Sequence, residues 1–189
     1  MTFGVFLLYY FYMKRLVLIL LAIFLSLPAT ALMLHGNAEF NAEIAREQTF
    51  RNIKYSFDQT TFQNFWKDPN FDKNYKAVSN GQTKIENRTL AWFSDGTYGV
   101  RYDYDPYHHY YYDIEGELFK VDVLDKRYDE YPHRSVAYNK FGAFKNATYA
   151  VSEDEQYLYD KNKRLLGHWI GNACYDGKGN VLMLRKKSN

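Results

Sequence analysis

The sequence predicts a mainly β (α+β) protein, in which an antiparallel β-hairpin meander forms an open sheet or a partly closed barrel after one or two short N-terminal helices. Three observations support this fold class. Short segments rich in Val, Thr and aromatic residues follow one another from Thr83 onward. A turn unit recurs four times among them. No helical segment long enough for a parallel crossover separates them.

The first 31 residues have the composition of a secretory signal peptide. Lys14 and Arg15 precede an apolar run, 16–27, and the small-residue pattern of 29–31. This run is shorter than the roughly 20 residues that a spanning helix needs, so no stable membrane span is expected after cleavage. A second apolar run precedes Met13, which indicates a translation start at Met13. The protein is therefore predicted to be exported to the periplasm, the cell surface or the medium, and to be membrane-tethered only if the signal is not cleaved.

The chain after the signal segment, 32–189, has balanced charge. Of the 24 basic residues, Lys14 and Arg15 leave with the signal, and the remainder equals the 22 acidic residues in number. The basic tail 185–187 is interpreted as a solvated end, so nucleic acid is not expected as a partner.

Cys174 is the single cysteine, which excludes an internal disulfide. We interpret it as a buried structural thiol, with intermolecular pairing or catalysis as alternatives. A catalytic pair with His168 is the only nucleophilic arrangement nearby, and no oxyanion-type loop accompanies it. No catalytic residue is therefore assigned.

Residues 32–80 are predicted to form a helical lead-in that packs on the sheet and shares one domain with 81–189. Asn37 can cap a short amphipathic helix over 38–48. The alternation of apolar and polar residues over 53–57 indicates a half-buried strand, and a helical reading is almost as good.

A second short helix is expected after Asp58 or Thr60, because the apolar residues of 62–66 share one helical face. A loop should follow over 68–80, where Pro, Asn and Asp are frequent. The pair Asn80-Gly81 then predicts a hairpin turn.

The region 81–189 is predicted to be β throughout. Its strands are expected at Thr83–Asn87, Thr89–Phe93, Tyr98–Tyr104, Tyr110–Tyr112, Glu117–Val123, Ser135–Tyr138, Ala143–Val151, Gln156–Tyr159, Leu165–Ile170 and Val181–Arg185.

The repeated turn unit reads Tyr, Asp or Asn, two free positions, usually Gly, one free position and an apolar residue. Asp or Asn accepts hydrogen bonds from the turn backbone, and Gly tolerates the positive φ of the bulge that rejoins the strand. The turn residues are Asp113, Gly116, Asn139, Gly142, Asp160, Asp176 and Gly179. In the third copy Lys163 replaces Gly, so Asn162 is expected to take the left-handed conformation and to shift the turn by one residue. The shrinking intervals between copies argue against a regular solenoid.

This unit resembles the Tyr-Asp (YD) repeats of large bacterial surface and polymorphic-toxin proteins. Residues 110–118 fit the repeat well, and 157–165 fit except for the missing Gly. The resemblance covers at most 98–184, with unequal spacing between copies. It implies exported β-hairpins and does not imply an activity.

The aromatic and acidic run 102–113 is the candidate binding stretch. Tyr rings stack on the apolar face of sugars while carboxylates accept hydrogen bonds from hydroxyls. The alternative is a strand whose Tyr rings cover the core. The candidate ligand-binding residues are Tyr102, Asp103, Tyr104, Asp105, Tyr107, His109 and Tyr110.

A metal site built from histidines 108, 109 and 133 is disfavoured, because adjacent strand residues point to opposite faces. No metal or cofactor is therefore expected. The sequence favours a non-enzymatic binding or structural module of the cell envelope or surface, with a glycan or an envelope protein as partner. The alternative is a small envelope hydrolase that acts on glycan through paired carboxylates between Asp103 and Asp113.

Overall fold

The structure is a computed structural model that describes residues 41–187. The chain divides into two compact units, Met1–Glu43 and Ile44–Asn189, and the description below concerns the second unit. The predicted signal segment 1–31, the proposed start at Met13 and the beginning of the predicted helix 38–48 lie outside the described residues. A helix does occupy 41–50, within and beyond that prediction.

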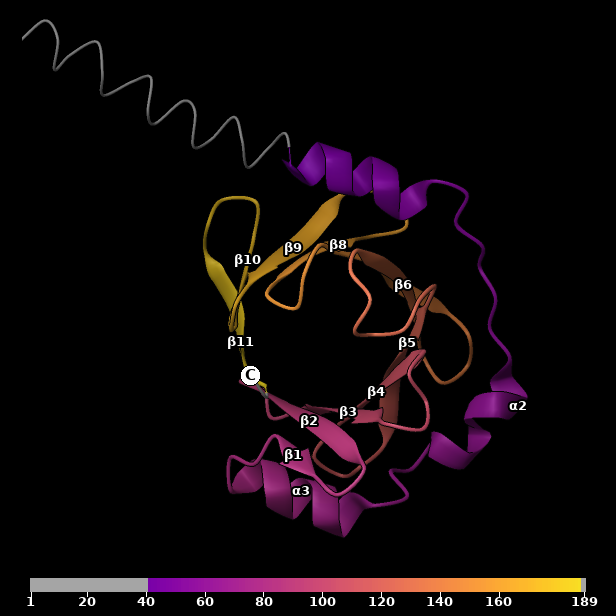
Figure 1. Ribbon diagram of the computed structural model, residues 1–189, viewed down its shortest axis with the longest axis vertical. Helices are drawn as coiled ribbons and strands as arrows, with labels where there is room; N and C mark the ends of the chain where they lie inside the picture. Colours follow the sequence, from indigo (N-terminus) through magenta and orange to yellow (C-terminus); the bar gives the residue numbers. More distant parts are fainter. Residues whose placement is uncertain (1–40, 188–189) are drawn as a thin grey trace, which may run out of the picture. The chain divides into compact units, whose positions relative to one another are not determined.

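The strands form one antiparallel sheet that closes into a barrel (Figure 1). Each strand from β2 to β10 pairs with its sequence neighbours, and β2 also pairs with β11, so ten strands complete the ring and β1 is an extra strand beside β2. The predicted mainly β meander is therefore confirmed, and the ten-stranded barrel closes through the pairing of β2 with β11. The strands are β1 Lys84–Ile85, β2 Arg88–Phe93, β3 Tyr98–Tyr102, β4 His108–Tyr112, β5 Leu118–Leu124, β6 His133–Tyr138, β7 Phe144–Ala150, β8 Glu155–Tyr159, β9 Leu165–Ile170, β10 Ala173–Tyr175 and β11 Val181–Lys186.

All four turn units adopt the same hydrogen-bonding pattern. In the first, Gly116 N donates to Asp113 O (3.0 Å), and the amides of Glu115 and Glu117 donate to Asp113 Oδ1 (3.0 and 2.8 Å). Asn139, Asp160 and Asp176 accept the corresponding bonds in the other three hairpins. The predicted turn role of these residues is thus confirmed.

The prediction for the third copy is wrong. Lys163 itself adopts the left-handed conformation, with φ +62°, and Asn162 does not. Lys163 N donates to Asp160 O (3.0 Å) as glycine does in the other copies, so the turn is not shifted. The five backbone and side-chain hydrogen bonds of the unit outweigh the strain at one residue, which amounts to about 1–2 kcal/mol.

Helix α3, Phe71–Ser79, replaces the loop predicted over 68–80. A buried polar network holds it to the barrel: Asn74 Nδ2 donates to both oxygens of Asp68 (3.1 and 2.9 Å), Arg88 Nε donates to Asn74 Oδ1 (2.6 Å), and Tyr98 OH donates to Asp68 Oδ2 (2.7 Å). Tertiary contacts therefore override a weak local preference for helix.

Gly81, at φ +72°, ends α3 rather than forming the predicted hairpin turn. Its amide donates to Val78 O (2.9 Å) and that of Gln82 donates to Ala77 O (2.9 Å), the pattern of a glycine-terminated helix. The segment 53–57 is also neither strand nor helix. Its Ile53 and Phe57 pack on the core. The apolar spacing therefore marks residues that pack on the barrel, although the segment pairs with no strand.

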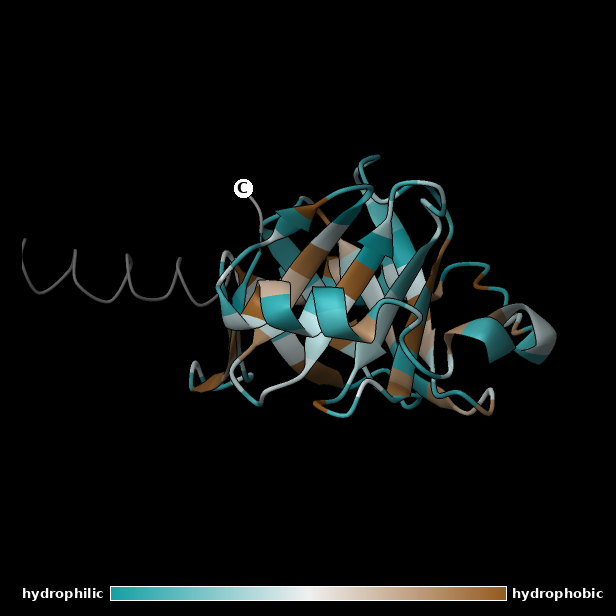
Figure 2. Cartoon of the chain, turned by 90° about the horizontal axis from the view of Figure 1, so that it is seen from below, coloured by the Kyte–Doolittle hydropathy of each residue, from teal (hydrophilic) through white to brown (hydrophobic). Residues whose placement is uncertain are grey.

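The main hydrophobic core lies outside the barrel, between its wall and the helices. Asp58 caps α2, Gln59–Phe62, by accepting from Thr60 N (3.0 Å), and the 3-10 helix η1, Gln63–Phe65, follows. Phe62 of α2 packs on β4 through Tyr110, and Phe65 of η1 packs on β3 and β4 through Tyr102 and Tyr110. Helix α3 lies beside β1 and β2 (Figure 1). In Figure 2, hydrophobic segments occur in the strands behind α3 and most loops are hydrophilic. A smaller apolar cluster of Phe93, Trp169 and Cys174 also forms on the barrel wall.

Candidate functional site: the barrel interior

The seven predicted ligand-binding residues occupy three environments. Tyr102 and Tyr110 are 1% exposed in the core beneath the helices, and the Tyr110 ring stacks on Phe65 at 4.3 Å. Tyr104 and Tyr107 are 63% and 46% exposed. The structure therefore does not bring these rings together on one concave face.

The acidic members of that stretch have structural partners. Asp103 pairs with Lys84 Nζ (2.9 Å). Asp105 accepts from Tyr110 OH (2.6 Å) and contacts His108 Nδ1 (2.7 Å). Burial alone would raise the pKa of Asp105, but the hydrogen bonds from His108 and Tyr110 bring it below its ordinary value. Asp105 thus ties the loop before β4 to the strand.

Asp113 lies at the opposite end of β4 from Asp103 and Asp105. The five residues of β4 span about 13 Å at the usual strand rise, which exceeds the roughly 5–10 Å between the carboxylates of a glycosidase. Asp113 therefore does not pair with either of the other two. Among residues 41–187, no group of three His, Cys, Asp or Glu side chains is placed to hold a metal ion.

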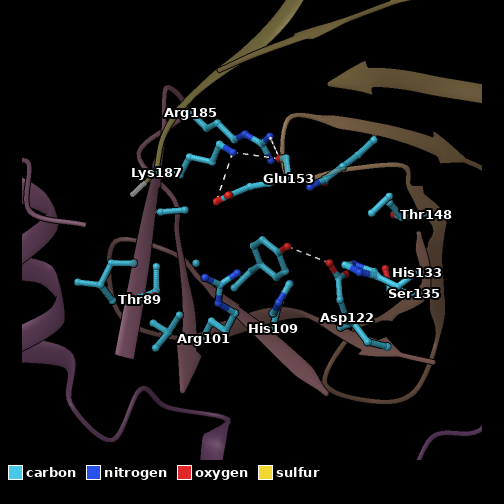
Figure 3. Close-up of a pocket in the computed structure, with 18 of the residues that line it drawn as sticks. Thr89, Arg101, His109, Asp122, His133, Ser135, Thr148, Glu153, Arg185 and Lys187 are labelled. Atoms are coloured by element: carbon cyan, nitrogen blue, oxygen red, sulfur yellow. Dashed lines mark hydrogen bonds and ion pairs between the residues drawn. The ribbon is translucent and has the colours of Figure 1, made fainter. Parts of the chain in front are cut away.

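His109 points into the barrel, unlike its neighbours 108 and 110. It lines a cavity of about 110 Å³ (Figure 3). The cavity walls carry polar side chains beside apolar ones, because strand residues alternate and the apolar side of β3 to β6 faces the external core. Polar residues that line it include Arg101, Asp122, Ser135, Thr148, Gln156 and Arg185.

Three polar atoms on adjacent strands of this wall are buried without a hydrogen-bond partner: Arg101 Nε, His109 Nε2 and Asp122 Oδ1. His109 is directly opposite Asp122 in the β4–β5 register, and β3 carries Arg101 on the other side of β4. Asp122 Oδ2 accepts from Tyr111 OH (2.8 Å). Buried polar groups normally have partners, so this row is the least satisfied part of the interior.

Positive charge dominates the cavity. The Arg101 guanidinium lies 3.7 Å from the centre of the Tyr128 ring and forms no ion pair or hydrogen bond with any described residue. Arg185 Nε and Nη2 donate to Gly171 O (3.1 and 2.9 Å), a carbonyl rather than a carboxylate. Lys187, by contrast, pairs with Asp154 Oδ1 (2.8 Å).

The electrostatic environment follows from this arrangement. Burial, followed by the charge of Arg101, lowers the pKa of His109 well below its ordinary value, so the imidazole is neutral near pH 7. Burial also raises the pKa of the Tyr111 hydroxyl and lowers that of Arg185. His133, whose pKa burial lowers, stacks on Tyr131 at 4.9 Å beside the cavity.

Figure 3 shows the labelled side chains entering the cavity from three sides. Arg101 and His109 project from one wall, Asp122 and His133 from a second, and Arg185 with Lys187 from the wall opposite the first. Such a constellation can bind a small polar molecule by charge and hydrogen bonds.

Sequence analysis identified His109 in this set and missed Arg101, Asp122 and Arg185. Their signal was present as polar residues at alternate strand positions. Alternation by itself does not show whether the polar face meets solvent or the interior, and closure of the sheet turns that face inward. The apolar residues of the N-terminal helices were the one sequence feature that could have indicated that the apolar face of the sheet lies on the outside of the barrel.

Cys174 is buried beside Phe93 and Trp169, and burial raises the pKa of its thiol. In the β9–β10 register Cys174 is opposite Trp169 and Tyr175 is opposite His168, so Cys174 and His168 point to opposite faces of the sheet. Cys174 is therefore a packing residue, as the sequence interpretation expected, and has no base beside it.

Comparisons of the chain with protein families, with curated proteins and with solved structures found no match. Within the described range 41–187, none of the helices has the length and apolar character needed to cross a membrane.

Proposed function

We propose that the protein is an exported, non-enzymatic binding module of the cell envelope or surface, and that the barrel interior takes up its ligand. The observation that supports this proposal is the cavity itself, with atoms of Arg101, His109 and Asp122 on its wall that lack a hydrogen bond. Side chains just fill the interior of a barrel of about eight strands, and the ring of ten strands here leaves room for a small ligand. Export rests on the signal-peptide pattern of 1–31.

The test is a ligand screen on the purified chain, with charged and neutral molecules of up to about six heavy atoms, read by thermal shift and isothermal titration. The variant Ser135→Phe fills the cavity, because Ser135 is buried on its wall. The matched control Ala143→Phe places the same ring on an exposed hairpin. Binding that Ser135→Phe removes and Ala143→Phe preserves supports the proposal. Binding equally retained by both variants, or no hit in the screen, overturns it.

A second candidate is glycan or protein contact through Tyr104 and Tyr107, supported by their large exposure. The Tyr104 ring stacks on Tyr102 at 5.1 Å, which holds it in one orientation for a sugar face. A glycan array of the intact chain and of Tyr104→Ala/Tyr107→Ala tests this contact. Signals that persist in the double variant contradict it.

A further inference from the structure

We infer that the barrel ligand is a small organic carboxylate with a hydroxyl at its far end, the acid bound by Arg101 and the hydroxyl by Asp122. This inference rests on the proposed binding function of the barrel and adds the chemical class of the ligand.

Arg101 is the group that selects an acid. Its guanidinium lies over the Tyr128 ring, which leaves the edges with the N–H groups free, and no described carboxylate lies within ion-pair distance of it. A guanidinium with free edges binds a carboxylate through two parallel hydrogen bonds. A partly buried cation without such a partner costs free energy in the empty protein, and an anionic ligand would remove that cost.

The remaining charges of the cavity do not compensate Arg101. Asp122 has Lys120 Nζ at 3.5 Å, and Lys187 has Asp154 at 2.8 Å, so these charges form pairs of their own. Arg185 adds a second guanidinium that donates only to carbonyls. The unpaired charge of the interior is therefore positive.

Asp122 supplies the acceptor at the other end. Its Oδ2 accepts from Tyr111 OH, and its buried Oδ1 has the ion pair with Lys120 Nζ at 3.5 Å but no hydrogen bond, so Oδ1 can still accept one. Since Lys120 already faces this carboxylate, a neutral hydroxyl suits it better than a second ammonium group. Arg101 and Asp122 lie on strands separated by β4, and two strand spacings place their backbones about 10 Å apart.

Size and polarity limit the body of the ligand. A cavity of about 150 Å³ takes up one benzene molecule, and this one has about 110 Å³. About half a dozen heavy atoms therefore fit, which excludes peptides and oligosaccharides. Ala91, Phe93 and Tyr111 line the same cavity and offer an apolar wall to a short carbon chain.

The experiment uses isothermal titration of the intact chain with 3-hydroxypropanoate, the neutral 3-hydroxypropanamide and propanoate, which lacks the hydroxyl. We expect 3-hydroxypropanoate to bind at least about tenfold more tightly than either of the others. Arg101→Met should remove the preference for the acid over the amide. The control Arg164→Gln, at an arginine side chain that is 76% exposed, should leave all three affinities unchanged.

Arg101→Met loses no hydrogen bond to the protein, and circular dichroism checks that it folds. A second variant, Asp122→Asn, should weaken the binding of 3-hydroxypropanoate and leave the binding of propanoate unaffected. Equal affinity for acid and amide, or an Arg101→Met variant that keeps the preference, overturns the inference. If the acids fail while a neutral ligand from the screen binds and Ser135→Phe removes it, the barrel function stands and the carboxylate assignment fails. If nothing binds, both fail.

Discussion

The residue in the left-handed position of each hairpin turn has a predictable effect on stability. Gly116, Gly142 and Gly179 hold this position at φ +75°, +84° and +86°, and Lys163 holds it at +62°. A non-glycine residue there is strained by about 1–2 kcal/mol. Glycine avoids this strain, but it makes the unfolded chain more flexible, which reduces the gain in stability by about 0.4–1 kcal/mol. Lys163→Gly should therefore raise the free energy of unfolding by about 0.5–1 kcal/mol.

The reverse substitutions separate backbone strain from steric clash. A Cβ at Gly179 meets nothing within 4 Å, so Gly179→Ala should lower the free energy of unfolding by strain alone, about 1 kcal/mol. A Cβ at Gly116 would lie 2.5 Å from Phe71 Cδ2, and overpacking should bring the total for Gly116→Ala to about 2–4 kcal/mol.

The assay is urea unfolding followed by tryptophan fluorescence, with Lys161→Gly as the control in the same turn. Lys161 lacks a positive φ, so its replacement should lower stability by about 0.5–1 kcal/mol. The reasoning is refuted if Lys163→Gly destabilises the protein as Lys161→Gly does. Equal losses of unfolding free energy for Gly179→Ala and Gly116→Ala would refute the predicted clash at Gly116.

Three further predictions follow from buried groups. Burial lowers the pKa of His109, so below about pH 6.5 the unfolded chain binds a proton that the folded chain does not, and the free energy of unfolding should decrease there. His109→Gln should reduce the difference between the urea midpoints measured at about pH 7.5 and 5.5. An unchanged difference contradicts the assignment to His109. Asn74→Ala removes donors from the buried Asp68 carboxylate and should lower the free energy of unfolding by about 3 kcal/mol, whereas a loss below about 1 kcal/mol would mean that the network does not hold α3. Tyr110→Ala should lower it by about 3–5 kcal/mol and the exposed Tyr104→Ala by less than about 1 kcal/mol, as measured by thermal melting; similar losses would contradict their different burial.

Local chemistry explains which parts of the fold the sequence predicted well. Turn geometry depends on residues within five positions, so the roles of Asp113 and Gly116 follow from the repeated unit. The same applies to the cap at Asp58. Strand β10 was missed because its three residues are too short to show a period, and α3 was missed because its stability comes from Asp68 and Arg88, which lie outside the helix.

The candidate site depends on long-range structure that the sequence did not predict. Alternation along β3 and β4 separates Arg101 and His109 from Tyr102 and Tyr110, and the sequence by itself determines that separation. It does not determine which set faces inward. That depends on the pairing of β2 with β11, which closes the sheet, and on the helices that cover the tyrosine face. Closure is a long-range event between strands about ninety residues apart, set by the accumulated twist and tilt of the whole sheet. Tertiary structure alone therefore placed the tyrosines in the core and an unpaired arginine in a cavity.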